Sequence, residues 1–329
     1  MSTHSKLQAS PLTFRPVLKT VMWGGSRLSA YKNLPDAPSN LGESWEISAV
    51  PEMETVVESG IYQDTPLSSL ARDFGAELLG SSVVSRYGNV FPLLIKFIDA
   101  AKDLSVQVHP DDTMAFQRHG CLGKAEMWYI IDADPEALIY SGFNTPLDSE
   151  SYLRHLHDDT LEDTLSSYRS RAGQVYFLPP GRIHAIGAGN LVAEITENSD
   201  VTYRIYDYGR LDSDGNPRTL HTDLALGAID FTHPVNVPFE TEPIPPEGQM
   251  LVDCRQFVTH LLQAAPTPLR LDHDSRSFTI VICISGKVIL TYPGGSLTLT
   301  AGHTALLPAL LDDVSIIGDG KVLTTRSRR

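Results

Sequence analysis

Alternating apolar and polar positions predict a series of short β-strands from residue 91 onward. Gly and Pro residues interrupt these runs and mark the turns between strands. We expect strands at residues 93–98, 104–108, 128–132, 137–140, 175–178, 191–196 and 201–206. Because many short strands with such turns are typical of a jelly-roll barrel, the pattern predicts a mainly β fold.

Two segments have helical spacing instead. After Pro66, residues 66–80 carry apolar side chains at helical intervals and predict one short helix. Residues 148–168 predict a pair of helices, because their acidic residues and serines would face outward and four leucines inward: Leu153, Leu156, Leu161 and Leu165. We expect both segments to be insertions in the β-barrel.

A stretch rich in Pro and Glu at residues 233–249 predicts an extended connection between two domains. We place the first domain at residues 1–240 and the second at residues 245–329. The second domain is again β-rich, with strands expected at residues 278–285, 286–292, 295–300 and 302–308.

The composition is that of an ordinary globular protein, with 329 residues of which 42% are hydrophobic and 20% are charged. The net charge of −14 argues against a broad nucleic-acid-binding face, so a phosphate-bearing ligand would need a local cationic pocket. The three cysteines are too few and scattered for a disulfide framework. No run approaches the ~18 apolar residues that a membrane helix requires. We therefore expect a cytoplasmic monomer.

Polar side chains in three predicted strands or turns indicate a metal site. Gln107 and His109 stand two residues apart in an alternating strand, so both side chains leave the same face. Glu126 opens the next β-like run, and His184 follows a Gly- and Pro-containing turn. A barrel would bring these four donors together. Imidazole and carboxylate ligands without a thiolate suit Zn²⁺, Fe²⁺ or Mn²⁺.

Any one of the 11 histidines is more often a surface or packed residue than a ligand. The spacing around His184 favours a ligand. Gly173, five residues, Pro179, one residue, Gly181, two residues and His184 match the second motif of the cupin superfamily, whose His binds a metal. The Asn that usually closes this motif comes two residues late, at Asn190, so we expect a slightly different turn after the ligand.

Three longer strings resemble the type I mannose-6-phosphate isomerases, also called phosphomannose isomerases, in their short bacterial form. They are Gln-x-His-Pro-Asp-Asp at 107–112, Lys-x-Glu-Met-Trp-Tyr at 124–129 and Asn-Ser-Asp-Val-Thr-Tyr-Arg at 198–204. The resemblance extends from about residue 14 to about residue 227. It implies a cupin jelly-roll barrel with helical insertions, a degenerate cupin-like C-terminal domain, and an enzyme that interconverts mannose 6-phosphate and fructose 6-phosphate.

This reaction assigns roles to the candidate residues. An aldose–ketose isomerisation passes through an enediol(ate), and a Lewis acid on the sugar oxygens stabilises its negative charge. One Zn²⁺ per chain, held by Gln107, His109, Glu126 and His184, could do this without a redox change. By resemblance Arg204 is the family's active-site arginine and would stabilise the enediolate. The ordinary alternative for Arg204 is a surface salt bridge.

Two residues are acid–base candidates, and the sequence does not decide between them. Lys124 would share the strand face of Glu126, and Glu194 carries a carboxylate into an apolar strand. Lys96 and Ser105 match family positions that face the substrate and its phosphate. The alternative for Lys96 is that its side chain extends to solvent.

Two other functions compete with the isomerase hypothesis. A different metallocupin enzyme, such as a dioxygenase, would need iron or copper and normally a His-rich first motif, so Gln107 argues against it. A non-catalytic protein that binds and senses sugar phosphates would not need Lys124, Glu194 and Arg204. In the C-terminal domain, Gly302 and Pro308 repeat the start of the cupin motif, but residues 309–312 supply no Gly or His. That domain should be metal-free and structural.

Overall fold

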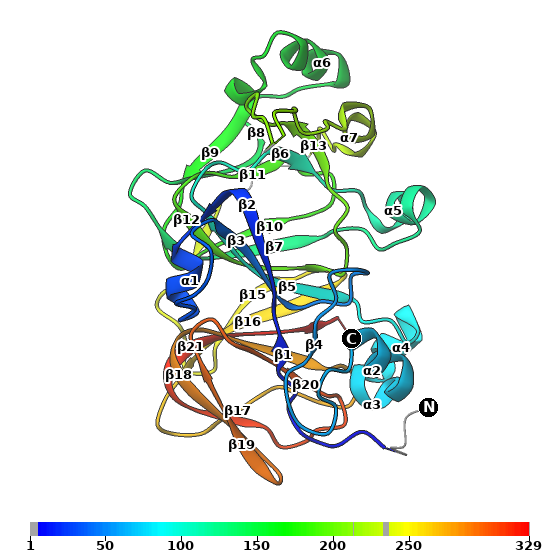
Figure 1. The fold of residues 1–329 in the computed structure, drawn as a ribbon, viewed down its shortest axis with the longest axis vertical. Helices are drawn as coiled ribbons and strands as arrows, with labels where there is room; N and C mark the ends of the chain where they lie inside the picture. The colour runs from blue at the N-terminus through cyan, green and yellow to red at the C-terminus, as the bar shows by residue number, and fades with distance from the viewer. Residues whose placement is uncertain (1–5, 213, 233–236, 329) are drawn as a thin grey trace.

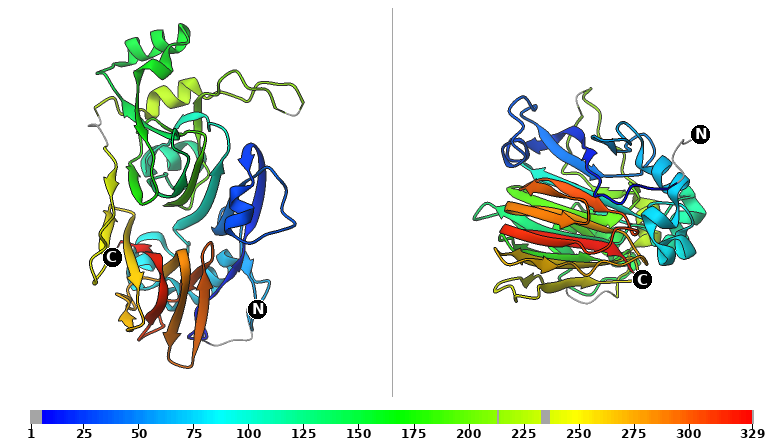
Figure 2. Two further views of the ribbon diagram at one scale, coloured as in Figure 1. Left: turned by 90° about the vertical axis from the view of Figure 1, so that its left-hand side faces the viewer. Right: turned by 90° about the horizontal axis from the view of Figure 1, so that it is seen from below.

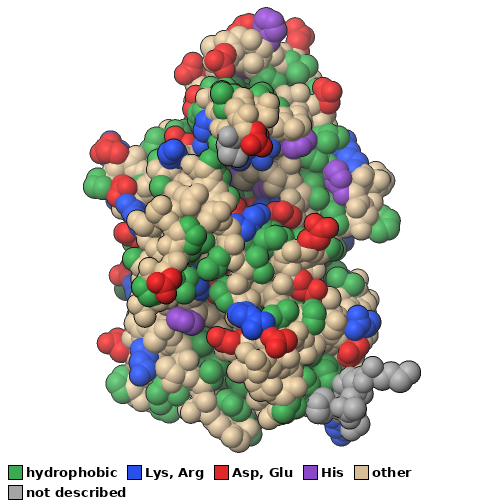
Figure 3. Space-filling view, viewed as in Figure 1, with side chains coloured by type: hydrophobic (Ala, Val, Ile, Leu, Met, Phe, Trp, Pro, Cys, Tyr) green, Lys and Arg blue, Asp and Glu red, His purple; other side chains and the backbone are tan. Residues whose placement is uncertain are grey.

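The computed structural model describes residues 6–212, 214–232 and 237–328, and the chain forms two stacked β-rich regions (Figure 1). The C-terminal strands, coloured yellow to red, lie below the strands of the N-terminal region in this view. On the face shown in Figure 3, basic side chains are interspersed with acidic ones. Among the described helices, none has the length and apolarity that crossing a membrane requires.

The N-terminal region consists of two antiparallel sheets packed face to face. The seven-stranded sheet has the order β14 (Phe239–Glu240), β10 (Gln174–Leu178), β7 (Glu126–Ala133), β12 (Asn190–Glu197), β5 (Leu93–Ala100), β3 (Leu41–Ile47), β2 (Val17–Gly25). The five-stranded sheet has the order β13 (Tyr203–Tyr206), β6 (Val106–Val108), β11 (His184–Ile186), β8 (Leu138–Phe143), β9 (Leu165–Arg169). Trp128 and Val192 of the first sheet form one apolar cluster with Ile139 and Ile186 of the second. This packing is the expected cupin jelly roll.

The C-terminal region is a third sheet with its own apolar interior. Its order is β15 (Gln249–Asp253), β16 (Phe257–Ala264), β21 (Ser315–Ser327), β18 (Thr279–Tyr292), β19 (Gly295–Thr300); β17 (Leu269–Arg270) pairs with β21 and β20 (Thr304–Leu307) with β18. One face packs on its own core, and the other packs against the N-terminal seven-stranded sheet. Figure 2 shows the two sheets stacked when the molecule is seen from below. The domain boundaries 1–240 and 245–329 remain a proposal.

The central strands β5 and β12 are buried along their whole length, because both faces of their sheet are covered. Ile95 and Ile195 pack toward Ile280 and Leu323 of the C-terminal sheet in one cluster. A strand covered on both faces can be apolar at nearly every position. The polar residues that do occur there, such as Lys96 and Glu194, are therefore exceptional.

The helices differ in part from the sequence prediction. The segment 66–80 is helical, but it divides into α2 (Leu67–Phe74) and α3 (Ala76–Leu79) at Gly75, whose φ is 45°. The other helices are α1 (Arg27–Tyr31), α4 (Ser81–Tyr87), α5 (Asp112–His119), α6 (Ser149–His157) and α7 (Thr222–Ala228). A short strand pair, β1 (Phe14–Arg15) and β4 (Val56–Val57), joins the N-terminal segment to the loop before α2.

The prediction of two helices at residues 148–168 was half wrong. Only α6 is an α-helix; a 3₁₀ turn, η1 (Leu161–Thr164), and strand β9 follow it. Leu153 is exposed, whereas Leu161 and Leu165 are buried. The second half forms a strand because its backbone pairs with β8, a tertiary contact that helical spacing of leucines cannot reveal.

The strands that were expected all form, with one difference in the C-terminal region, whereas β2, β3, β15, β16 and β21 were not predicted. Residues 279–292 form the single strand β18 instead of two strands. The register with β21 shifts between Cys283 and Ser285, and Gly286 next to this irregularity has a φ of 69°. A bulge at a glycine bends the strand without ending it.

Candidate active site

The register of the five-stranded sheet aligns three predicted site residues. Gln107 on β6 pairs with His184 on β11 and with Arg204 on β13. Directly paired residues of neighbouring strands project from the same face of a sheet. His109 follows β6 immediately, and Glu126 begins β7 on the opposite sheet. The barrel therefore brings together residues far apart in the sequence.

His109, Glu126 and His184 form a buried cluster whose potential ligand atoms all lie within 4.8 Å of one another. The Nε2 atom of His109 is 3.2 Å from Oε2 of Glu126, and the two imidazole centroids are 4.9 Å apart. The three residues are between 0% and 2% exposed. Such a set of two imidazoles and one carboxylate matches the donors of many Zn²⁺ sites.

The hydrogen bonds of both histidines direct the second ring nitrogen, Nε2, into the cluster, where Nε2 of His109 lies 3.2 Å from Nζ of Lys124. Nδ1 of His109 donates to the carbonyl of Val201 at 2.9 Å, and Nδ1 of His184 donates to the carbonyl of Arg182 at 2.8 Å. Because a carbonyl only accepts, each Nε2 carries the lone pair. Nε2 of His184 and Oε1 of Glu126 are buried and have no hydrogen-bond partner among the described residues. Buried acceptors without donors fit a bound cation.

The local electrostatics favour the protonation states that bind a metal. Burial lowers the pKa of His109 well below its usual value, as do the neighbouring Lys124 and His184, and burial also lowers the pKa of His184. Burial would raise the pKa of Glu126, but Lys124 and His184 outweigh this effect and lower it to about 2. Two neutral imidazoles and an ionised carboxylate result.

Gln107 lines a cavity of about 330 Å³ that adjoins the cluster. The strand register places Gln107 next to His184, and Gln107 is half-buried. Its predicted role as a fourth metal donor remains a proposal. The same cavity is lined by the other candidates that lie outside the cluster: Lys96, Ser105, Lys124, Glu194 and Arg204.

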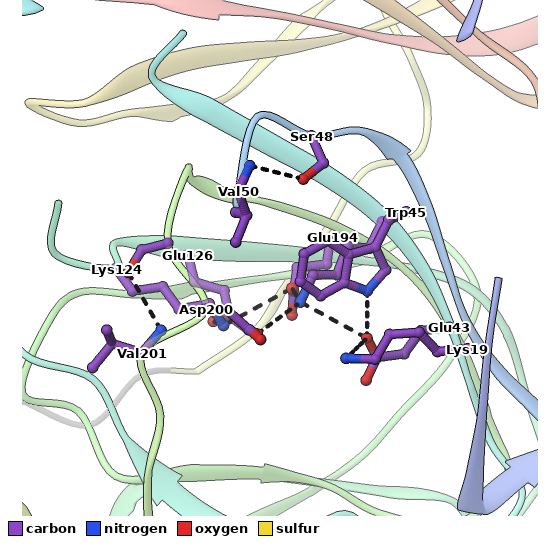
Figure 4. Close-up of polar contacts among 12 residues, drawn as sticks. Lys19, Glu43, Trp45, Ser48, Val50, Lys124, Glu126, Glu194, Asp200 and Val201 are labelled. Atoms are coloured by element: carbon purple, nitrogen blue, oxygen red, sulfur yellow. Dashed lines mark hydrogen bonds and ion pairs between the residues drawn. The ribbon is translucent and has the colours of Figure 1, made fainter. Parts of the chain in front are cut away.

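Lys124 and Glu194 line the cavity, and both lie close to Glu126 of the cluster (Figure 4). Nζ of Lys124 donates to Oε2 of Glu126 at 2.8 Å and lies 3.9 Å from Oε1 of Glu194. The other carboxylate oxygen of Glu194 accepts from the indole of Trp128 at 3.2 Å. Both acid–base candidates are at most 4% exposed. The structure brings them together and leaves both open as proton carriers.

Family models and known proteins agree with this arrangement. A model described as phosphomannose isomerase type I, catalytic domain, matches residues 12–140, and one described as mannose-6-phosphate isomerase, cupin domain, matches residues 250–327. A mannose-6-phosphate isomerase from Streptococcus mutans is 31% identical over 320 residues, which cover 97% of this chain and 99% of that protein. The chain belongs to the type I phosphomannose isomerase family.

Further members of the family support the assignment. A putative mannose-6-phosphate isomerase from Bacillus subtilis is 33% identical and covers 94% of this chain and 96% of its own. The crystal structure of mannose 6-phosphate isomerase from Bacillus subtilis has a TM-score of 0.83 at 31% identity, over 96% of this chain and 99% of that one. A mannose 6-phosphate isomerase bound with zinc and yttrium shares the fold at 17% identity, with a TM-score of 0.76 over 98% and 100% of the two chains. The predicted family and the mainly β cupin fold are confirmed.

Within this family fold, Lys96 and Arg204 have defined surroundings. Lys96 is 4% exposed and does not extend to solvent; Nζ lies 3.4 Å from Oε1 of Glu194 and 4.1 Å from the ring centre of Trp45. Burial would lower the pKa of Lys96, but Glu194 and other carboxylates raise it above its usual value. Arg204 lines the cavity instead of forming a surface salt bridge: its Nη1 donates to the carbonyl of Thr219 at 2.9 Å.

Sequence reasoning missed several residues of the cavity wall. Asp200 lies within the string 198–204, and Glu43 lies within the longer stretch over which the chain resembles the family. Both residues line the cavity, and the resemblance could have indicated them. Lys19 and Arg218 also line the cavity. Arg218 lies in the connection between β13 and α7, and no strand or motif spacing pointed to it.

Proposed function

We propose that the protein interconverts mannose 6-phosphate and fructose 6-phosphate through an enediol(ate), with one Zn²⁺ per chain. The observation that carries this proposal is the buried set of His109, Glu126 and His184 beside a polar cavity in a member of the isomerase family; Nε2 of His184 and Oε1 of Glu126 have no donor among the described residues. Gln107 would be the fourth donor. We further propose that the protein is a cytoplasmic monomer, since Cys121, Cys254 and Cys283 are free thiols suited to a reducing compartment.

The residues of the chain would have separate roles in the reaction. When bound, the metal ion would polarise the two sugar oxygens between which charge moves. Glu194 or Lys124 would remove the proton from C2 of the aldose and return it to C1, while a second proton passes between the two oxygens. The two side chains lie 3.9 Å apart, so one can hold a proton while the other acts. The guanidinium of Arg204 would stabilise the enediolate oxygens.

The burial of these groups supports this chemistry. Lys124, Glu126 and Glu194 are enclosed by protein, and little water would compete for the transferred proton. The network of alternating charges also fixes the side chains before substrate arrives, and preorganisation is the main source of electrostatic catalysis. Ser105 and Lys96, which also line the cavity, would contact the bound substrate.

A coupled assay with metal analysis tests the proposed function. We expect the purified protein to convert mannose 6-phosphate to fructose 6-phosphate and to contain zinc. A dioxygenase would instead contain iron or copper and consume oxygen. A sensing protein would bind the sugar phosphate without turnover. Either of these results, in a protein that holds its metal, would contradict the proposal.

A further inference from the structure

Charge is distributed unevenly around the active-site cavity. At one end, the lysines are matched by carboxylates. Lys96 lies within 4.0 Å of Glu194, Glu43 and Asp200, and Lys19 lies 3.8 Å from Glu43. Lys124 contacts Glu126 and Glu194. Apart from Glu126, which belongs to the candidate metal site, three carboxylates balance these three lysines, so the lysines offer no surplus positive charge to a phosphate dianion.

At the other end, three arginines surround one carboxylate. Arg210 and Arg218 both form ion pairs with Oδ1 of Asp207, and Arg204 lies near enough to interact with Arg218, Arg210 and Asp207. Asp207 is 5% exposed. Burial would raise the pKa of Asp207, but the two arginines outweigh it and lower the pKa, so the carboxylate is ionised. The arginine end therefore carries a surplus of positive charge.

Asp207 fixes the orientation of Arg218. The Nε atom of Arg218 donates to Oδ2 of Asp207 at 2.7 Å, and its Nη2 donates to Oδ1. This bidentate contact uses one edge of the planar guanidinium. Among the described residues, no hydrogen bond is found for Nη1 of Arg218, and the residue lines the cavity. A rigid, charged donor is thus held at the cavity wall.

Backbone hydrogen bonds place this arginine on the far side of Arg204 from the metal cluster. In the five-stranded sheet, His184, Gln107 and Arg204 follow one another on β11, β6 and β13. The free edge of β13 then bonds the segment after Arg218: the amide of His221 donates to the carbonyl of Arg204 at 2.7 Å. The guanidinium of Arg204 donates to the carbonyl of Thr219. The segment that carries Arg218 therefore lies beside β13, on the side away from β6 and β11.

We infer that Arg218, held by Asp207, binds the phosphate group of the substrate; this inference rests on the proposed function. The reacting carbons of a hexose 6-phosphate lie at one end of the sugar and the phosphate at the other. With C1 and C2 at the metal cluster, the phosphate extends past Arg204 to the arginine end. Arginine binds phosphate bidentately and is always charged. This assignment moves the phosphate away from Lys96, one of the two positions where the family resemblance had placed it.

Arg218→Gln tests the inference, with Arg169→Gln as the matched control, because Arg169 is an exposed arginine paired with Glu136 outside the cavity. We expect Arg218→Gln to raise KM for mannose 6-phosphate and the dissociation constants of fructose 6-phosphate and inorganic phosphate by roughly 10- to 100-fold, the effect of losing a charged hydrogen bond. The kcat should change by less than about 3-fold, because the phosphate does not react. Arg169→Gln should leave KM, both dissociation constants and kcat unchanged.

Two further variants keep the test decisive. Arg218→Lys keeps the charge and should recover part of the phosphate affinity, which also covers the case in which Arg218→Gln fails to fold. Asp207→Asn should raise KM with little change in kcat, as expected for a positioning residue. Unchanged phosphate affinity in folded Arg218→Gln would overturn the inference.

The binding measurements separate this inference from the proposed function. Titration calorimetry with inorganic phosphate and the zinc-loaded protein requires no turnover. If the wild-type protein fails to isomerise mannose 6-phosphate but Arg218→Gln still loses phosphate binding, the proposed function fails and the phosphate site stands. If the wild-type protein isomerises the sugar and Arg218→Gln binds phosphate normally, the phosphate site alone fails.

Discussion

At the scale of single residues, metal binding would depend on imidazole nitrogens that are oriented before any ligand binds. His184 is 1% exposed. Its Nδ1 donates a hydrogen bond to the carbonyl of Arg182, and its Nε2 has no partner among the described residues. We expect His184→Ala to lose the metal and the isomerase activity together, because three remaining donors bind zinc weakly. Metal content by atomic emission and turnover in the coupled assay check this.

A second histidine provides the control for this variant. His303 is exposed and lies in the C-terminal domain, where we propose that no metal binds. His303→Ala should keep full metal content and turnover. Full metal content in His184→Ala, or metal loss in His303→Ala, would contradict the assignment of the site.

Arg204 is expected to act mainly on the transition state. Burial, together with Arg218, lowers the pKa of its guanidinium, and its Nε is buried without a partner among the described residues. Arg204→Ala should keep the zinc and slow kcat by roughly 10²- to 10³-fold, as when one oxyanion donor is removed. Steady-state kinetics on metal-loaded protein measure this. An unchanged kcat with only a raised KM would make Arg204 a ground-state contact.

The residues of the metal cluster could be predicted from sequence because local spacing fixes their direction. His109 is placed by the alternation of one strand, and His184 by a Gly- and Pro-containing turn that leads into another. Asp207 and Arg218 could not be predicted. Their contact joins two ends of a connecting segment, and the surplus charge that they create appears only when Arg204 packs beside them.

At the scale of secondary-structure elements, the end of β12 positions the segment that carries the acid–base candidate Lys124 and the candidate metal ligand Glu126. The carboxylate of Glu197 accepts from the amide of Ala125 at 2.8 Å, between Lys124 and Glu126. Glu197 is 1% exposed. Burial, together with the negative charge of Asp112, raises the pKa of Glu197 to about 8.

This raised pKa predicts a pH dependence of stability. Between the usual value of 4.5 and about 8, the folded protein holds a proton on Glu197 that the unfolded chain does not hold. The contribution of Glu197 is therefore fully present below pH 4.5 and is lost as the pH rises through 8. Glu197→Gln keeps an acceptor for Ala125 and should become more stable relative to wild type as the pH rises.

Urea denaturation at several pH values between 5 and about 9 measures this difference. Glu136→Gln is the matched control, since Glu136 is an exposed carboxylate paired with Arg169. Its free energy of unfolding should follow that of the wild type at every pH. A constant difference between Glu197→Gln and wild type across this range would contradict the predicted titration.

Elements with two covered faces were the easiest to predict. The apolar runs of β5 and β12 are continuous because other sheets pack on both sides of them. The segment 161–169 was predicted as helix because its leucines also fit helical spacing, but pairing with β8 decides its conformation. Periodicity alone does not show which neighbouring strand a segment will pair with.

At the scale of the whole molecule, a buried lysine, Lys32, joins the two β-rich regions. Nζ of Lys32 donates to Oε1 of Glu46 at 2.7 Å and to the carbonyl of Gly302 in the C-terminal region. Both side chains are 4% exposed. We expect Lys32→Met to lower the free energy of unfolding by about 3–5 kcal/mol, because it leaves the charge of Glu46 buried without its partner.

The double variant Lys32→Met/Glu46→Gln tests this explanation. It removes the unpaired charge and should recover part of the lost stability. Lys102→Met replaces an exposed lysine and should change the free energy of unfolding by less than about 0.5 kcal/mol. Urea denaturation gives all three values. A double variant that is less stable than Lys32→Met would show that the loss has another origin.

The presence of a second β-rich region could be predicted from its strand pattern, but its arrangement relative to the first region could not. Phe91 stacks on Phe278 with centroids 4.7 Å apart, and Leu12 pairs with Leu306 across the two regions. These contacts join residues separated by long stretches of chain. Local periodicity carries no information about which outer face covers which sheet.

The central claim is that a metal held by His109, Glu126 and His184 drives the isomerisation. The most direct test is to remove the metal with a chelator, titrate Zn²⁺ back, and measure the initial rate of mannose 6-phosphate conversion. We predict that the metal-free protein is inactive and that activity rises with added zinc and levels off at about one ion per chain. A metal-free protein with full activity, or a zinc-loaded protein with none, would contradict the account.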